Sequence, residues 1–375
     1  MHENLSDFIL AQANPPLYSP TETILELLAS SEKTSILASC LKKYPSLVTL
    51  LTTAGEELTI FAPTNQAFQS SEYPHGDISE ETLRYHIVSA SLSLSRIMTS
   101  TITSCPTFLS PASLGGPQRL SLCVTEHGMA INTKAQATSF DTFACNGVIH
   151  TIDSILKCPL PRREVIAQLP KERFGKFARA FSLTKLEEEI ILAGNGSTLF
   201  VPTDMAFAEL GQAANEFLFD SEEGLRYLRA LLKFHTVAGH TLYSTAYYGP
   251  NKPMAQGGKQ GKTSPPANDK EDKNKSPAIL KSEEDKRKPS FPRGYKSWGL
   301  PSLLGETLTI EVFRYGSIIA MRVGDALEFP AINHLTEEGV LHLTEKILLP
   351  AGLRISEGGR QITVEEFKAS LERYL

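Results

Sequence analysis

Two pairs of short segments recur along this 375-residue chain, in the same order both times. Residues 59–68 read TIFAPTNQAF and residues 198–207 read TLFVPTDMAF, so six of the ten positions are identical. Further along, residues 147–156 (GVIHTIDSIL) are matched by residues 339–348 (GVLHLTEKIL). Motifs repeated in the same order indicate that one fold is present twice. The repeat therefore predicts two similar domains, in which the shared residues hold up a fold.

The composition is that of a soluble globular protein. Hydrophobic residues make up 41 % and charged residues 21 % of the chain, and its length is ample for two domains of ordinary size. The net charge of -5 is too small to indicate nucleic acid or a membrane surface as partner. No apolar run approaches the ~20 residues that span a bilayer, so we expect no transmembrane segment. Residues 1–8 lack the basic and apolar regions of a secretory signal peptide, which taken literally predicts an intracellular protein.

Each unit has the same local pattern around its first motif. Residues 59–62 alternate as a strand, and Pro63 ends that strand because it cannot donate a hydrogen bond to the ladder. Thr64 or Asn65 is then placed to cap a short helix that carries Phe68. Apolar residues at helical spacing precede both strands. The corresponding residues of the second unit are Thr198, Phe200, Pro202, Thr203, Asp204 and Phe207.

The pattern divides the chain into four parts. We expect a flexible N-terminal arm at residues 1–20, a first domain at 21–160, a second domain at 161–350 and a C-terminal amphipathic extension at 351–375. The second unit is longer than the first, and its surplus coincides with residues 249–297, which are rich in Lys, Pro, Gly and Ser. Such a segment buries too little apolar surface to offset its ordering entropy, so we expect a disordered insertion there. The aromatic residues at its end, around Trp298, either pack the chain back onto the domain or form an exposed binding site.

At these motifs the chain resembles the fasciclin domain family, as a tandem two-domain protein of fungal type. The family's first signature is matched by residues 59–68 and 198–207. Its central Tyr-His element corresponds to Tyr85-His86 in the first unit and to Phe234-His235 in the second. Its closing signature is matched at residues 146–156. The second copy departs from that signature, with Glu338 for Asn and Thr344-Glu345 for Ile-Asp.

The resemblance implies an α+β fold with two domains, each a β-wedge of about seven strands packed with several helices. It also implies adhesion or protein–protein interaction at cell surfaces, in matrix or in vacuolar compartments. Animal members use the Tyr-His neighbourhood to bind integrins, so the binding candidates are Tyr85, His86, Phe234 and His235. Because Phe234 replaces the tyrosine, the first copy is the more credible surface. The family implies no cofactor.

Four repeated histidines invite a metal-binding or acid–base hypothesis. Each lies beside aliphatic residues, where an imidazole nitrogen commonly satisfies a buried backbone group. His150 and Asp153 could form an orienting pair, but no third partner is evident, and no Cys or His pair has the spacing of metal ligands. We therefore expect no metal and favour a protein without catalysis of its own. The residues assigned to a structural motif are Thr59, Phe61, Pro63, Thr64, Asn65, Phe68, His150, Thr198, Phe200, Pro202, Thr203, Asp204, Phe207 and His342.

Five cysteines lie in the first half of the chain, at positions 40, 105, 123, 145 and 158. An odd number confined to one half is a poor disulfide framework, so buried free thiols are favoured. Pairing of Cys105 with Cys123 and of Cys145 with Cys158 remains the alternative.

These features give a main functional hypothesis and two others. The main one is a non-catalytic tandem interaction or adhesion module with a protein partner. The second is an auxiliary protein of a fungal polyketide pigment pathway, because fungal proteins that resemble this layout act beside oxidases; it would bind a small phenolic molecule or help its coupling. The third is a vacuolar or trafficking protein.

Overall fold

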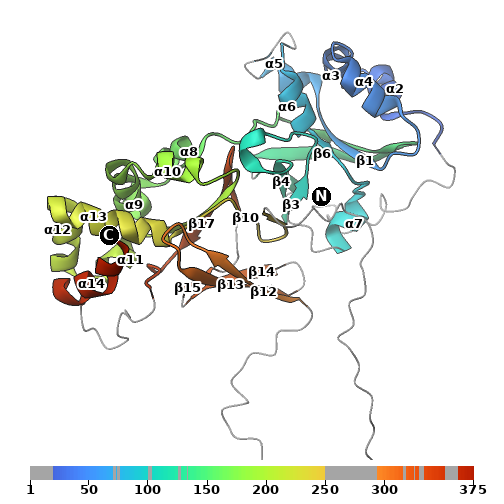
Figure 1. Ribbon diagram of the computed structural model, residues 1–375. Helices are drawn as coiled ribbons and strands as arrows, with labels where there is room; N and C mark the ends of the chain where they lie inside the picture. The colour runs from blue at the N-terminus through green and yellow to red at the C-terminus, as the bar shows by residue number, and fades with distance from the viewer. Residues whose placement is uncertain are drawn as a thin grey trace, which may run out of the picture.

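The computed structural model describes residues 20–70, 73, 77–99, 104–125, 128–132, 134–249, 294–315, 318–324, 326–328, 333–350 and 362–375. They form two lobes, the first coloured blue to teal and the second green to red in Figure 1. The expected N-terminal arm and most of the expected insertion lie outside the described residues. Residues 295–297 are an exception, because they already belong to a strand that begins at Tyr295.

Short helices between residues 24 and 52 open the first domain and pack against one face of its sheet. Thr23 begins the first of them with a capping box, in which its hydroxyl accepts from the Glu26 amide and the Glu26 carboxylate accepts from the Thr23 amide. Pro45 occupies the first turn of another, where its missing N–H costs nothing. The helices are α2 (Ile24–Ser30), α3 (Ser35–Leu41), α4 (Pro45–Thr52), α5 (Asn65–Gln69), α6 (Glu80–Tyr85), α7 (Leu94–Thr99) and the 3₁₀ turn η1 (Ala112–Leu114).

A seven-stranded sheet, in the order β2-β1-β7-β6-β5-β4-β3, forms the rest of the first domain. The central strands β1 and β7 run parallel, and the other neighbours run antiparallel. Every residue of β1 is buried, because Leu58, Ile60 and Ala62 face the helices while Phe61 faces a second core on the other side. The strands are β1 (Leu58–Pro63), β2 (Ile87–Val88), β3 (Ser104–Pro106), β4 (Arg119–Thr125), β5 (Gly128–Ile131), β6 (Ala135–Ala144) and β7 (Gly147–Ile152).

The second domain repeats this plan with its strands divided among smaller sheets. One four-stranded sheet, β16-β17-β8-β9, keeps the parallel pair of motif strands β17 and β8. A second sheet, β12-β13-β14-β15, and the hairpin β10-β11 complete it. The strands are β8 (Ser197–Pro202), β9 (Thr236–Ala238), β10 (Thr241–Leu242), β11 (Tyr247–Tyr248), β12 (Tyr295–Pro301), β13 (Thr307–Tyr315), β14 (Ile318–Val323), β15 (Ala326–Glu328), β16 (His334–Thr336) and β17 (Gly339–Thr344). The α+β class expected from the sequence is confirmed.

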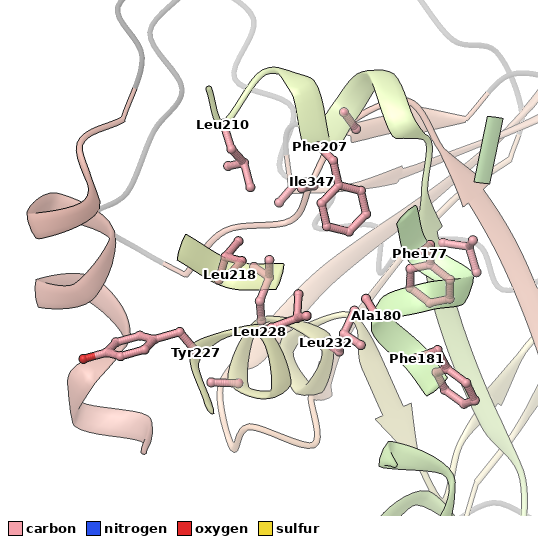
Figure 2. Close-up of a cluster of buried hydrophobic side chains, with 14 of the residues drawn as sticks. Phe177, Ala180, Phe181, Phe207, Leu210, Leu218, Tyr227, Leu228, Leu232 and Ile347 are labelled. Atoms are coloured by element: carbon pink, nitrogen blue, oxygen red, sulfur yellow. The ribbon is translucent and has the colours of Figure 1, made fainter. Parts of the chain in front are cut away.

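Helices of the second domain enclose a core rich in phenylalanine and leucine, drawn in Figure 2, where the labelled side chains Phe207 and Ile347 lie close together. Phe367 and Leu371 of α14 belong to this same buried cluster. The helix α14 therefore packs within the second domain, where the sequence predicts a separate extension at 351–375. The helices are α8 (Arg162–Gln168), α9 (Lys171–Thr184), α10 (Leu186–Leu192), α11 (Asp204–Ala208), α12 (Gln212–Asp220), α13 (Glu222–Phe234), α14 (Val364–Leu371) and η3 (Glu372–Tyr374).

The two domains contact each other around Arg119, the first residue of β4, and the residues just before it. The Arg119 guanidinium is 6 % exposed, donates to the Tyr248 hydroxyl at 3.1 Å and lies over the ring of Tyr243. Next to it, Gln118 donates from Nε2 to the backbone oxygen of Thr336 at 2.9 Å. Gly116 lies so close to the Tyr248 ring that a Cβ there would come within 2.8 Å of it. These contacts join the first domain to β11 and β16 of the second.

Two further expectations concern cysteines and membranes. No disulfide joins the five cysteines; Cys105 is buried and Cys123 is exposed. Within the part of the chain that the structure describes, no helix combines the length and the apolar character that crossing a bilayer requires.

Candidate functional site

The first motif of each domain performs the same local task. The Thr64 hydroxyl accepts from the Ala67 amide and caps α5, and the Thr203 hydroxyl accepts from the Ala206 amide and caps α11, each at 3.3 Å. The side chains that follow, Asn65 and Asp204, both accept a backbone N–H from an earlier helix. Polar groups occupied in this way hold the strand–proline–helix turn together.

The threonine that begins each motif fixes a loop on the neighbouring strand. Thr59 donates from its hydroxyl to the oxygen of Ala90 and accepts from the Leu92 amide, at 2.6 and 2.8 Å. Thr198 makes the equivalent pair, with the oxygen of His240 at 2.9 Å and the amide of Leu242 at 2.8 Å. Both threonines are fully buried.

The central histidines form one arrangement twice. His86 contacts the oxygen of Thr82 through Nδ1 at 2.7 Å, and its Nε2 accepts from the Leu156 amide at 2.9 Å. His235 has the same contacts with the Leu231 oxygen at 2.8 Å and the Leu348 amide at 2.9 Å. Because Nε2 accepts in both, each ring carries its proton on Nδ1 and is neutral. Each histidine thereby ties the end of a helix, α6 or α13, to the last residue of the closing motif.

Histidines of the closing motif are held in a similar way. His150 contacts the Leu92 oxygen through Nε2 at 2.7 Å and stacks on Phe61 at 5.7 Å between ring centroids. His342 contacts the Leu242 oxygen through Nε2 at 2.8 Å and stacks on Phe200 at 5.8 Å. In each domain, the loop is therefore held by hydrogen bonds from two side chains. Thr59 and His150 hold it in the first domain, and Thr198 and His342 hold it in the second.

Burial disfavours the charged form of the imidazoles of His86, His150 and His235. It lowers the pKa of His86 and the pKa of His235 to about 4 each, because the charged ring would lose its hydration. Burial also lowers the pKa of His150. A general base works best with a pKa near the operating pH, and these rings lie inside the protein with both nitrogens directed at backbone groups. They are poorly suited to acid–base chemistry.

Asp141, a residue that the sequence did not single out, lies beside His150. Its carboxylate is 4.0 Å from His150 Nδ1 and accepts from the Leu94 amide at 2.8 Å. Burial raises the pKa of Asp141. The pair proposed from the sequence is not formed, since Asp153 instead accepts from the Gln136 amide and the Ser154 hydroxyl. Asp141 reaches His150 because β6 is irregular at this point and Asp141 takes a left-handed conformation, with φ 54°.

The Tyr-His positions expected to bind a partner are buried in both domains. Tyr85, His86 and His235 are 0 % exposed, and Phe234 is 6 % exposed. The Tyr85 hydroxyl donates to the Arg119 oxygen and accepts from Asn132 Nδ2, whereas Phe234 packs among aliphatic residues. A partner would reach these side chains only if the strands around them opened.

The departure of the second closing motif preserves a contact. Asn146 accepts from the Ile24 amide at 2.8 Å, which attaches the first helix of domain one to β7. Glu338 accepts from the Arg162 amide at 2.9 Å and so attaches the first helix of domain two to β17. The carboxylate also lies 4.0 Å from the Arg162 guanidinium. The asparagine and the glutamate thus play the same part, because the side chain of each accepts a hydrogen bond from a backbone amide of the domain's first helix.

The described residues contain no group of three or more His, Cys, Asp or Glu side chains able to hold a metal ion. The repeated polar residues do not converge on an open space where a substrate could react. Chemically, the twofold arrangement can fix loops and helices against a sheet.

A family model described as the fasciclin domain matches residues 32–159 and 172–270. The aurofusarin biosynthesis cluster protein S of Gibberella zeae is 30 % identical over 242 residues, which are 62 % of this chain and 58 % of that protein. Stabilin-2 of Mus musculus is 31 % identical over 200 residues, but the matched part is only 7 % of its length. A solved FAS1 domain pair from the insect cell adhesion molecule Fasciclin I is 14 % identical, with a TM-score of 0.36, over 87 % of this chain and 96 % of that chain.

Proposed function

The chain belongs to the fasciclin domain family, and from that premise we propose that it is a non-catalytic interaction module that presents a protein-binding surface on a tandem domain scaffold. One observation carries the proposal: the polar groups of the repeated motifs bond to backbone atoms inside each domain, and they do so in the same way twice. A chemical site would need at least one of these groups to face a substrate. We therefore propose that the protein acts by binding a partner at its surface.

We place the partner contact at the end of α10. Ile191 is 59 % exposed and Leu192 is 86 % exposed, and the two are adjacent in sequence. Single exposed aliphatic residues are ordinary, but neighbouring ones at a helix end form an apolar spot that a partner can cover.

Cross-linking of the tagged full-length protein in its own cells tests this proposal. A specific protein partner is expected, and its recovery should fall at least fivefold in the Ile191→Ser, Leu192→Ser double variant. Met205→Ser is the matched control, because Met205 is 74 % exposed on α11. Equal recovery from both variants, or no specific partner, would contradict the proposal.

A second candidate role comes from the Gibberella zeae relative, whose name places it in a biosynthesis cluster. On this alternative the chain assists a pigment pathway and binds a small phenolic molecule. Genes for a polyketide synthase or a laccase next to its own gene would favour it. Deletion of the gene would then change the pigments that the cells produce, whereas unchanged pigments would exclude it.

A further inference from the structure

A cavity of about 430 Å³ opens between α9, α11 and α12 of the second domain, away from the repeated motifs. This volume is within the range of small-molecule pockets, roughly 300–1,000 Å³. Positions 212, 215, 216, 219 and 220 of α12 line it, and this spacing puts them on one face of the helix. Lys176 and Arg179 project from α9 on the opposite wall, and Ala208 and Gly211 complete the lining.

Two cations, Lys176 and Arg179, and two carboxylates, Glu216 and Asp220, line the cavity, and Glu216 accepts from the Gln212 amide. The Arg179 guanidinium pairs with the Asp220 carboxylate at 3.2 Å and lies over the Phe219 ring at 5.4 Å. Lys176 is half-buried, and its ammonium donates to the amide oxygen of Asn215 at 3.2 Å. Among the described residues, no carboxylate forms an ion pair with Lys176. A half-buried ammonium whose partner is a neutral amide can accept an anion from the cavity.

The two domains can be compared at this position, because one hydrogen bond sets the register between them. Asn65 Oδ1 accepts from the Ile36 amide, and Asp204 Oδ1 accepts from the Lys176 amide. Ile36 and Ser39 of α3 therefore occupy the places of Lys176 and Arg179. Both cations are features of the second domain alone, and the shared scaffold does not require them.

We propose that this cavity binds a small organic carboxylate with a flat apolar body. The Lys176 ammonium would hold the carboxylate, while Phe219 and Ala208 contact the apolar body. Gln212 and Asn215 donate their amide N–H groups within the protein, to the Glu216 carboxylate and to the backbone oxygens of Phe207 and Gly211. The site is independent of the protein-binding surface proposed on α10.

Calorimetric titration of the full-length protein with 2-naphthoate, and with the neutral 2-naphthalenemethanol as its isostere, tests the assignment. We expect the naphthoate to bind at least tenfold more tightly, because a charge-assisted hydrogen bond to the ammonium has no counterpart in the alcohol. Lys176→Met should abolish that preference and Lys176→Arg should retain it. Lys171→Met removes the same charge from an exposed position on α9 and should leave binding unchanged.

Three results would overturn the assignment: no naphthoate binding at millimolar concentration, equal binding of both probes, or an unchanged preference in Lys176→Met. Thermal melting of each variant confirms that it is folded.

Discussion

Replacing Gly147 with alanine is expected to destabilise the first domain by about 3 kcal/mol or more, enough to leave much of it unfolded. Gly147 has a φ of 151°, which side-chain-bearing residues rarely adopt, and a Cβ there would be 2.2 Å from the backbone oxygen of Leu58. The parallel strands β1 and β7 would have to separate where Leu58 and Gly147 are in register.

Chemical denaturation followed by circular dichroism measures this effect. Gly339→Ala should act in the same way in the second domain, since its Cβ would be 2.1 Å from the Ser197 oxygen. Gly175→Ala is the control: it lies within α9, its Cβ would meet only Asp204 Oδ2 at 3.5 Å, and alanine favours helix. If Gly147→Ala and Gly175→Ala unfold at the same denaturant concentration, the assigned contact between β1 and β7 is wrong.

Replacing His86 with alanine is expected to lower the free energy of unfolding by about 3 kcal/mol. The change removes a buried ring, leaves a cavity and strips the Leu156 amide and the Thr82 oxygen of their partner. His235→Ala removes the same two kinds of contact in the second domain and should cost a similar amount.

Thermal melting of the two variants beside His240→Ala measures the difference. His240 is only partly buried and contacts the hydroxyl of Tyr247, so its loss should cost less than about 1 kcal/mol. Unaltered melting of His86→Ala, together with loss of a binding or catalytic activity, would assign His86 to function.

Much of the fold was predictable because the deciding interactions are local or repeated. Pro63 ends β1 and Thr64 caps the next helix, and both effects act within a few residues. The second copy at Pro202 and Thr203 supplied an independent example within the same chain. The α+β class then followed from the family resemblance.

The rest depends on contacts between residues far apart in sequence. Asp141 meets His150 only through an irregular β6, and such a bulge leaves no signature in the residues. Glu338 was recognised as a departure, but its role as the acceptor for the Arg162 amide depends on how α8 enters the domain. Arg119 belongs to no repeated motif, and its bond to the Tyr248 hydroxyl of the second domain depends on how the two domains meet.

Contacts between distant residues also explain why the binding candidates are buried. Tyr85 and Phe234 were selected from family resemblance, which identifies positions but not their exposure. In the structure both side chains contact residues from later in the chain: Asn132 bonds to the Tyr85 hydroxyl, and Phe234 shares a buried cluster with side chains of β13 and β14. The cavity beside α12 could not be predicted from the sequence for a similar reason. Its lining comes from α9 and α12, which lie far apart in the chain.

The titration of His86 and His235 by NMR tests the scaffold role of the repeated histidines most directly. Both pKa values are lowered from about 6.5 in the unfolded chain to about 4 by burial. Their contribution to stability is therefore complete above pH 6.5 and is lost as the pH falls toward 4, by about 1.4 kcal/mol per pH unit for each ring. We predict that the ring resonances of the folded protein stay those of neutral imidazole down to about pH 5. Midpoints near 6.5 for either residue would show a solvated ring and contradict the structural role.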